Sequence, residues 1–136
     1  MSLTWKEISL NEEMILEKLP IEKVQLVKYA GASGDFNMIH QDEETALKVG
    51  LPKIIAHGML SMGFLGEHLK DIVGENGFVK NLKVQFRGMV FIEDKVICKA
   101  IAKKKNEQEK LIDLDILAET AEGRVVTKGS ASIKYY

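Results

Sequence analysis

Two polar side chains that could transfer a proton lie close together in the first third of the chain. Asp35 and His40 are five residues apart, and Gly31 and Gly34 precede them. Because glycines interrupt regular structure, we expect both side chains in an irregular loop after a helix. A carboxylate and an imidazole can share a water, from which one takes a proton while the other donates to a substrate. Aspartate after glycine is also a common turn residue, and Asn37 would continue such a turn, so the pair alone leaves a structural role open.

A second feature could stabilise negative charge on a substrate. His57 and Gly58 stand at the start of a long apolar segment. If that segment is a helix, the Gly58 N–H has no intrahelical acceptor and lies at the positive end of the helix dipole. An exposed backbone N–H of this kind can hold an oxyanion without a charged side chain. Glycine also permits close packing, and the residues alone leave both explanations open.

Other chemistries are less well supported by the residue pattern. The side chains that could be grouped as a metal site are Asp35, His40, His57 and His68. None of the other residues in this group lies at helical i,i+4 spacing from His40 or His57, so we expect no metal. The sequence has no dinucleotide-binding fingerprint, and we expect no cofactor.

Two further groups could be considered functional. Ser33 and Ser61 could be nucleophiles, but neither lies in a G-x-S-x-G elbow. Residues 103–105 are three consecutive lysines that could contact an anionic carrier. We expect them to be solvated at the tip of a hairpin.

Composition limits the possible partners and location of the protein. The chain has 136 residues and a formal net charge of −1, which does not favour binding to nucleic acid or an anionic membrane. We expect one domain over residues 1–136. No apolar run approaches the ~20 residues of a membrane span, and no secretory signal is apparent, so we expect a cytoplasmic protein. Cys98 lies in an apolar alternation and is expected to be buried and inert.

The apolar pattern predicts helices followed by strands. Helices are expected over residues 21–30, 41–49 and 57–73, whereas residues 14–19 could form a strand or a helical turn. The third helix is apolar around most of its circumference and contains several glycines. We therefore expect it to be enclosed on several sides. Strands are expected over residues 78–90, 94–103, 110–119 and 124–136, connected as an antiparallel meander. A sheet curling around a buried helix is an α+β arrangement.

The two chemically suggestive motifs together resemble a known family. The string S-G-D-F-N-M-I-H at residues 33–40, followed by I-A-H-G-M at residues 55–59, is similar to the motif of MaoC-like dehydratases, which include R-specific enoyl-CoA hydratases. Residues 27–32 also resemble the segment that leads into this motif. The resemblance is specific over about residues 25–66.

The resemblance implies a fold, an activity and site residues. The fold would be a hot-dog fold, usually a homodimer with its site near the subunit interface. Asp35 and His40 would be the catalytic pair, the Gly58 N–H would bind the thioester carbonyl, and Asn37 and His57 would have supporting roles. The substrate would be an acyl-CoA or acyl-carrier-protein thioester in fatty-acid or polyhydroxyalkanoate-type metabolism. The reaction would interconvert trans-2-enoyl and (R)-3-hydroxyacyl thioesters.

Two alternatives remain within this fold: an acyl-CoA thioesterase and a non-catalytic acyl-binding subunit. The sequence also departs from the family motif at Met38, where the family commonly has proline. Proline restricts φ, so methionine could loosen the loop that carries Asp35 and His40.

Overall fold

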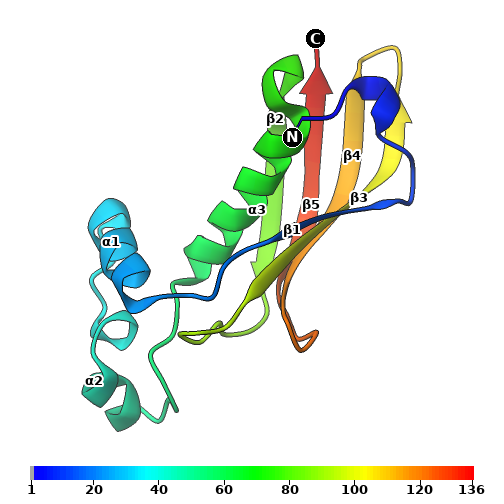
Figure 1. The fold of residues 1–136 in the computed structure, drawn as a ribbon. Helices are drawn as coiled ribbons and strands as arrows, with labels where there is room; N and C mark the ends of the chain where they lie inside the picture. Colours follow the sequence, from blue (N-terminus) through cyan, green and yellow to red (C-terminus); the bar gives the residue numbers. More distant parts are fainter. Residues whose placement is uncertain (1) are drawn as a thin grey trace.

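The structure is a computed structural model that describes residues 2–136 (Figure 1). It contains three α-helices and five strands. The helices are α1 (Lys23–Ser33), α2 (Glu43–Lys48) and α3 (Gly58–Val73). The strands are β1 (Glu13–Glu17), β2 (Gly77–Phe86), β3 (Val96–Asn106), β4 (Leu111–Thr120) and β5 (Val125–Tyr135). Short 3₁₀ turns are η1 (Trp5–Glu7), η2 (Met38–His40) and η3 (Gly74–Asn76).

The five strands form one antiparallel sheet in the order β1-β3-β4-β5-β2. The expected meander is correct for β3 to β5, but β2 pairs with β5 instead of β3. The expected strand over residues 78–90 was also too long, because β2 ends at Phe86. Beyond it the chain bonds to the segment that precedes α3. The Ala56 N–H donates to the Val90 carbonyl at 2.7 Å, and the Ile92 N–H donates to the Ile54 carbonyl at 3.0 Å.

The ambiguous segment at residues 14–19 is a strand over most of its length, because β1 pairs with the free edge of β3. The prediction for the lysines at residues 103–105 was only partly correct: Lys103 and Lys104 are exposed, as expected, but the three do not lie at the tip of a hairpin. They lie within β3, which continues to Asn106 after a register shift between Ala102 and Lys104. The Lys105 amine donates to the Trp5 and Ile8 carbonyls at 2.7 and 2.8 Å, so it binds the N-terminal segment.

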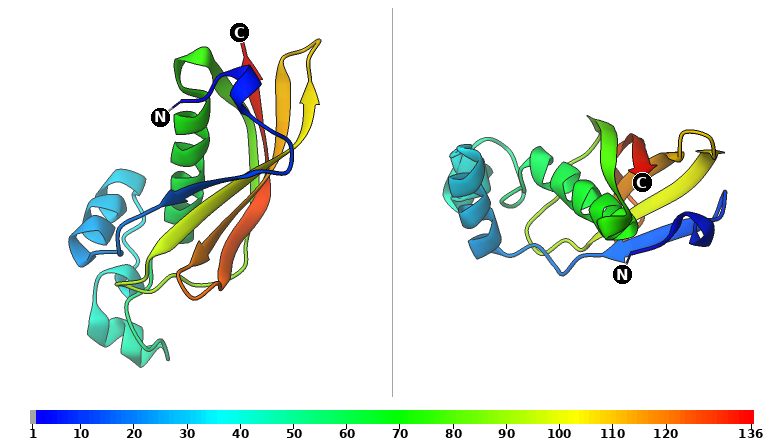
Figure 2. Two further views of the ribbon diagram at one scale, coloured as in Figure 1. Left: turned by 45° about the vertical axis from the view of Figure 1, so that its right-hand side comes forward. Right: turned by 90° about the horizontal axis from the view of Figure 1, so that it is seen from above.

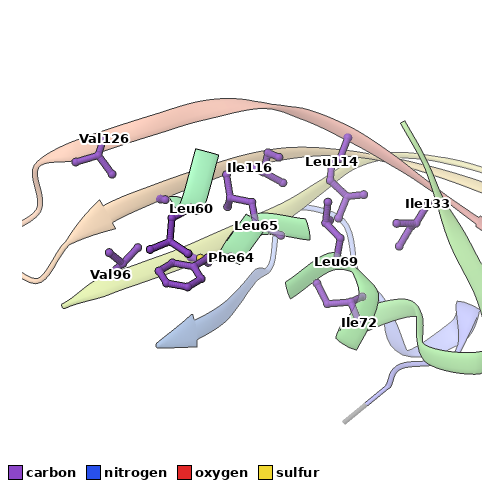
Figure 3. Packing of buried hydrophobic residues seen from close by; sticks show 14 of the residues in the cluster. Leu60, Phe64, Leu65, Leu69, Ile72, Val96, Leu114, Ile116, Val126 and Ile133 are labelled. Atoms are coloured by element: carbon purple, nitrogen blue, oxygen red, sulfur yellow. The ribbon is translucent and has the colours of Figure 1, made fainter. Parts of the chain in front are cut away.

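Helix α3 lies along the concave face of the sheet, which curves around it (Figure 2). Its buried apolar side chains pack against those of the strands (Figure 3). The labelled members of this core are Leu60, Phe64, Leu65, Leu69, Ile72, Val96, Leu114, Ile116, Val126 and Ile133. This is the antiparallel sheet around a long central helix that the hot-dog prediction requires, and the α+β prediction is confirmed.

The expectation that α3 is enclosed on several sides is only partly correct. Met59 is 54% exposed, and a Cβ atom on Gly63 would meet no other atom within 4 Å. Within one chain, α3 therefore buries one face against the sheet and leaves the opposite face uncovered. Gly58 lies closer to its neighbours, since a Cβ atom there would be 3.4 Å from the Phe86 ring.

The segment with α1 and α2 lies beside the N-terminal end of α3, away from the centre of the sheet (Figures 1 and 2). Helix α1 begins at Lys23 and buries Leu26 and Ala30. Val24 and Val27, two apolar residues of the same helix, are exposed. The helix also continues past Gly31 and ends at Ser33, with Gly34 as its C-cap residue.

Two further expectations concern Cys98 and membrane-spanning helices. Cys98 is buried, as predicted, and burial raises the pKa of its thiol to about 12. None of the helices formed by residues 2–136 is long and apolar enough to cross a membrane.

Candidate active site

The loop between α1 and α2 is folded by short-range hydrogen bonds that start from its polar residues. Gly34 has φ +78°, which reverses the chain at the end of α1. The Asn37 N–H donates to Asp35 Oδ1, and the Ile39 N–H donates to Asn37 Oδ1, both at 3.2 Å. Asn37 therefore caps η2, the turn that carries His40. The supporting part expected of Asn37 in the reaction stays a prediction.

His40 is held by the segment that precedes α3. Its Nδ1 lies 2.7 Å from the Ile55 carbonyl oxygen. A carbonyl can only accept, so Nδ1 carries the hydrogen and a neutral ring leaves Nε2 as an acceptor. Nε2 lies 3.9 Å from Asp35 Oδ2. The His40 ring is buried, whereas the Asp35 side chain is 53% exposed, so the pair has one fixed and one solvent-accessible member.

His57 lies against both members of this pair. Its Nε2–H donates to the backbone carbonyl of Asp35 at 3.1 Å. Its ring stacks on the His40 ring, with 3.8 Å between centroids and 25° between planes. The edge of Tyr29 packs against it at 4.8 Å. Burial, with a smaller contribution from neighbouring His40, lowers the pKa of His57 and favours the neutral ring.

Gly58 is the first residue of α3, directly after the N-cap His57. A helix offers no internal acceptor to an N–H at this position, so the Gly58 N–H can bind a ligand. The same turn is attached to the sheet through Ser61, whose Oγ lies 2.8 Å from the Gly58 carbonyl and 2.5 Å from Thr127 Oγ1. Ser61 and Thr127 are both buried.

The structure thus brings together Asp35, His40, His57 and Gly58, which are distributed over two separate segments of sequence. Three other candidates lie elsewhere or have local roles. His68 is farther along α3, where its Nε2–H donates to the Met14 carbonyl at 2.9 Å. Ser33 Oγ accepts from the Asp35 N–H at 3.2 Å, and Ser61 forms the helix contacts above.

Asp35, His40 and His57 each offer a possible metal-ligating atom, and these atoms lie within 4.8 Å of one another. An imidazole nitrogen ligates a metal at about 2.0–2.1 Å, through a lone pair in the ring plane. The His40 and His57 planes are only 25° apart and stacked, so their lone pairs do not converge on one ion. The expectation of no metal stays a prediction, and the ring geometry favours it.

Several contacts at the site could not be identified from the sequence. The Ile55 carbonyl that orients His40 belongs to an apolar residue, so nothing in its side chain signals the contact. Thr127 comes from β5, far along the chain. The contact of Ser61 with Gly58 is weakly indicated by the sequence, because residues three apart on a predicted helix are neighbours.

Comparison with known proteins agrees with this fold and shows the family of the chain. Residues 8–123 match the family described as the MaoC like domain. An (R)-specific enoyl-CoA hydratase from Rhodospirillum rubrum is 29% identical over 114 residues, covering 83% of this chain and 78% of that protein.

Two solved structures share the fold. The (R)-hydratase from A. caviae involved in PHA biosynthesis has a TM-score of 0.88 and 22% identity, covering 96% of this chain and 99% of that one. The R-hydratase PhaJ1 from Pseudomonas aeruginosa has a TM-score of 0.89 and 21% identity, and the match covers 96% of this chain and 84% of that one. Since the family match covers most of the chain and the fold agrees over nearly all of it, the chain belongs to the MaoC-like family and is a homologue of the (R)-specific enoyl-CoA hydratase.

Proposed function

We propose that this protein is a hydratase that adds water to trans-2-enoyl thioesters and forms (R)-3-hydroxyacyl thioesters, or catalyses the reverse dehydration. The observation that carries the proposal is the pairing of Asp35 Oδ2 with His40 Nε2 at 3.9 Å, beside the start of α3. Family membership supports the reaction type. The thioester carrier is CoA or acyl carrier protein.

The Asp35–His40 pair suits a single bound water. Both atoms are hydrogen-bond acceptors when Asp35 is ionised and His40 is neutral. A water has two hydrogens, and at hydrogen-bond lengths of about 2.8 Å it can donate one to each of two acceptors separated in this way. Its oxygen lone pairs are then free to attack C3 of the enoyl group.

The Gly58 N–H is suited to bind the thioester carbonyl. Addition of water at C3 moves the π electrons of the C2–C3 bond toward C2 and the carbonyl oxygen, which becomes negatively charged. The Gly58 N–H, at the positive end of α3, stabilises this charge as it develops. Glycine also leaves space for the carbonyl to approach the backbone.

The proton balance requires no further reactant. One water proton passes to the Asp35–His40 pair as the C3–O bond forms, with Asp35 as the initial acceptor. The same proton is returned to C2 through His40. One water therefore supplies both the hydroxyl group at C3 and the new hydrogen at C2 of the 3-hydroxyacyl product. The reverse sequence eliminates water. We assign Asp35 and His40 as catalytic residues, and Asn37 as the residue that shapes their loop.

We also propose that residues 1–136 act as one domain and that two copies associate as a homodimer. Five surface hollows of about 160 to 450 Å³ are formed by the described residues, and none of the five is lined by Asp35, His40 or Gly58. Large apolar side chains are exposed in the site loop, at the start of α3 and at the end of β2. They are Phe36, Met38, Met59, Phe86 and Met89. A second copy covering them would supply the missing wall of an acyl pocket.

Hydration of a series of trans-2-enoyl-CoA substrates of increasing chain length tests the proposal. The expected result is loss of enoyl absorbance, formation of the (R)-3-hydroxyacyl product and no release of free thiol. Release of free thiol without formation of a 3-hydroxyacyl product would instead identify a thioesterase. A purified protein that leaves every chain length unchanged, as CoA and as acyl-carrier-protein thioesters, would refute the assignment.

A further inference from the structure

We infer that His57 is a positioning residue that holds Asp35 and His40 in register with the Gly58 N–H, an inference that rests on the proposed function. Its position in the chain makes this possible. His57 is the N-cap residue of α3, and Gly58 follows it directly. The ring reaches the loop between α1 and α2, so one residue contacts all the groups assigned to the reaction.

The contact with Asp35 is made through the backbone. The His57 Nε2–H donates to the Asp35 carbonyl at 3.1 Å. The Asp35 side chain is 53% exposed, and its Oδ1 is engaged by the Asn37 N–H. The bond from His57 therefore fixes the part of Asp35 from which the carboxylate projects and leaves Oδ2 available.

The contact with His40 is made through the ring face. The two imidazoles stack 3.8 Å apart, and Tyr29 packs edge-on against His57 at 4.8 Å. The Ile55 carbonyl holds one edge of the His40 ring. Together the edge contact and the stacked face prevent the His40 ring from tilting, so Nε2 keeps its direction toward Asp35.

The second nitrogen of His57 argues against a purely stabilising role. Nδ1 is buried and has no hydrogen-bond partner among residues 2–136, in a side chain that is only 3% exposed. Burying a polar atom without a partner costs free energy. An apolar ring would avoid that cost, so the benefit of histidine at this position is the Nε2–H bond to Asp35.

His68 provides a matched control on the same helix. It is also buried, and its Nε2–H also donates to a backbone carbonyl, that of Met14 at 2.9 Å. It contacts none of the proposed reacting groups. Replacing either histidine with phenylalanine keeps a ring and removes the same kind of hydrogen bond, but only the change at His57 acts on the site.

The test compares His57→Phe, His57→Gln and His68→Phe by kcat and KM with crotonyl-CoA, with Tm measured for each. A misplacement of about 1 Å in a catalytic group can cost about 100-fold in rate. We therefore expect His57→Phe to lower kcat by about 10- to 100-fold with KM within about twofold of wild type. His57→Gln, whose amide can reach the Asp35 carbonyl, should recover part of the loss. His68→Phe should lower Tm and leave kcat unchanged.

Wild-type kcat in His57→Phe, or an equal fall in kcat in His68→Phe, would overturn the inference. If phenylalanine at residue 57 prevents folding, His57→Asn replaces it in the comparison, because its shorter amide cannot reach the carbonyl that glutamine reaches. If the wild-type protein hydrates no enoyl thioester, the proposed function fails separately. Backbone amide NMR signals of residues 35–40 then decide the positioning role: they should shift in His57→Phe and not in His68→Phe, and unshifted signals in both would refute it.

Discussion

The rings of His40 and His57 stack with 3.8 Å between centroids. Two imidazolium cations at this separation would repel each other, so at most one ring can readily carry a proton. Burial lowers the pKa of His57, which favours the neutral form of this ring. The proposed roles divide structural support and proton transfer between these two adjacent rings.

The first prediction concerns the dependence of stability on pH. Burial lowers the pKa values of His57 and His68 below the ordinary histidine value of about 6.5. The unfolded chain then binds more protons than the folded chain as pH falls below about 6.5, so the contribution of both rings to stability is full above this value and decreases below it. Urea unfolding between pH 8 and 5.5 should show falling stability, with a smaller fall in His68→Phe. An equal pH dependence in both proteins would contradict this explanation.

The second prediction addresses Met38, where the family commonly has proline. Asn37 has φ −56° and ψ 125°, a conformation compatible with a following proline, and Met38 is the first residue of η2. Met38→Pro should therefore be tolerated and should stabilise the chain by about 0.4–1 kcal/mol, by restricting the unfolded state. Urea unfolding measures the change.

Ile39→Pro is the matched control for Met38→Pro, because it removes the N–H that donates to Asn37 Oδ1. It should be clearly destabilising. A destabilised Met38→Pro would show that the loop requires a conformation or a hydrogen bond that proline cannot provide. The structure does not support the concern that methionine loosens this loop, since the side chain of Asn37 already caps the turn.

The third prediction separates the two explanations for glycine at residue 58. A Cβ atom on Gly58 would lie 3.4 Å from the Phe86 ring, while one on Gly66 would lie 3.7 Å from Leu82. Both substitutions to alanine fit after small shifts, and alanine favours a helix by up to about 1 kcal/mol over glycine. Gly58→Ala should lower kcat/KM at least about 10-fold by crowding the approach to the N–H. Gly66→Ala should leave it unchanged, and equal activity in both variants would favour a packing role for Gly58.

The fourth prediction tests the homodimer. Phe86 is 50% exposed at the end of β2, close to Gly58. Phe86→Glu should shift the protein from dimer to monomer, measured by light scattering, and should reduce hydration activity at low protein concentration. Leu19→Glu is the control. It introduces the same charge at a side chain that is more exposed, at 82%, on the connection between β1 and α1, and it should leave the mass unchanged. An unchanged mass for Phe86→Glu would exclude this surface from the interface.

The sequence was sufficient to predict the segments that carry the site, because their signals are local. Glycine breaks indicated the loop with Asp35 and His40, and apolar periodicity indicated α3 with Gly58 at its start. Strand order was not predictable in the same way. Alternation indicates that a segment is a strand but does not indicate its partner. Strand β2 pairs with β5, and residues 87–95 return from it along the segment before α3.

The finer geometry of the site depends on tertiary contacts. The stacking of His57 on His40 and its bond to the Asp35 carbonyl join residues from different segments, so spacing could not reveal them. The contacts of Lys105 were not predictable from the sequence for a similar reason. Its partners are backbone carbonyls near the N-terminus, which have no sequence signature.

We propose that Asp35 and His40 together activate water. This is tested by kcat for crotonyl-CoA hydration in Asp35→Asn and His40→Asn, with folding verified by circular dichroism. Asparagine at residue 40 can keep a donor near the Ile55 carbonyl while removing the Nε2 acceptor. We predict that each variant loses about 100- to 10,000-fold in kcat, the usual contribution of a general acid or base. Wild-type turnover by either folded variant would show that the pair does not activate water.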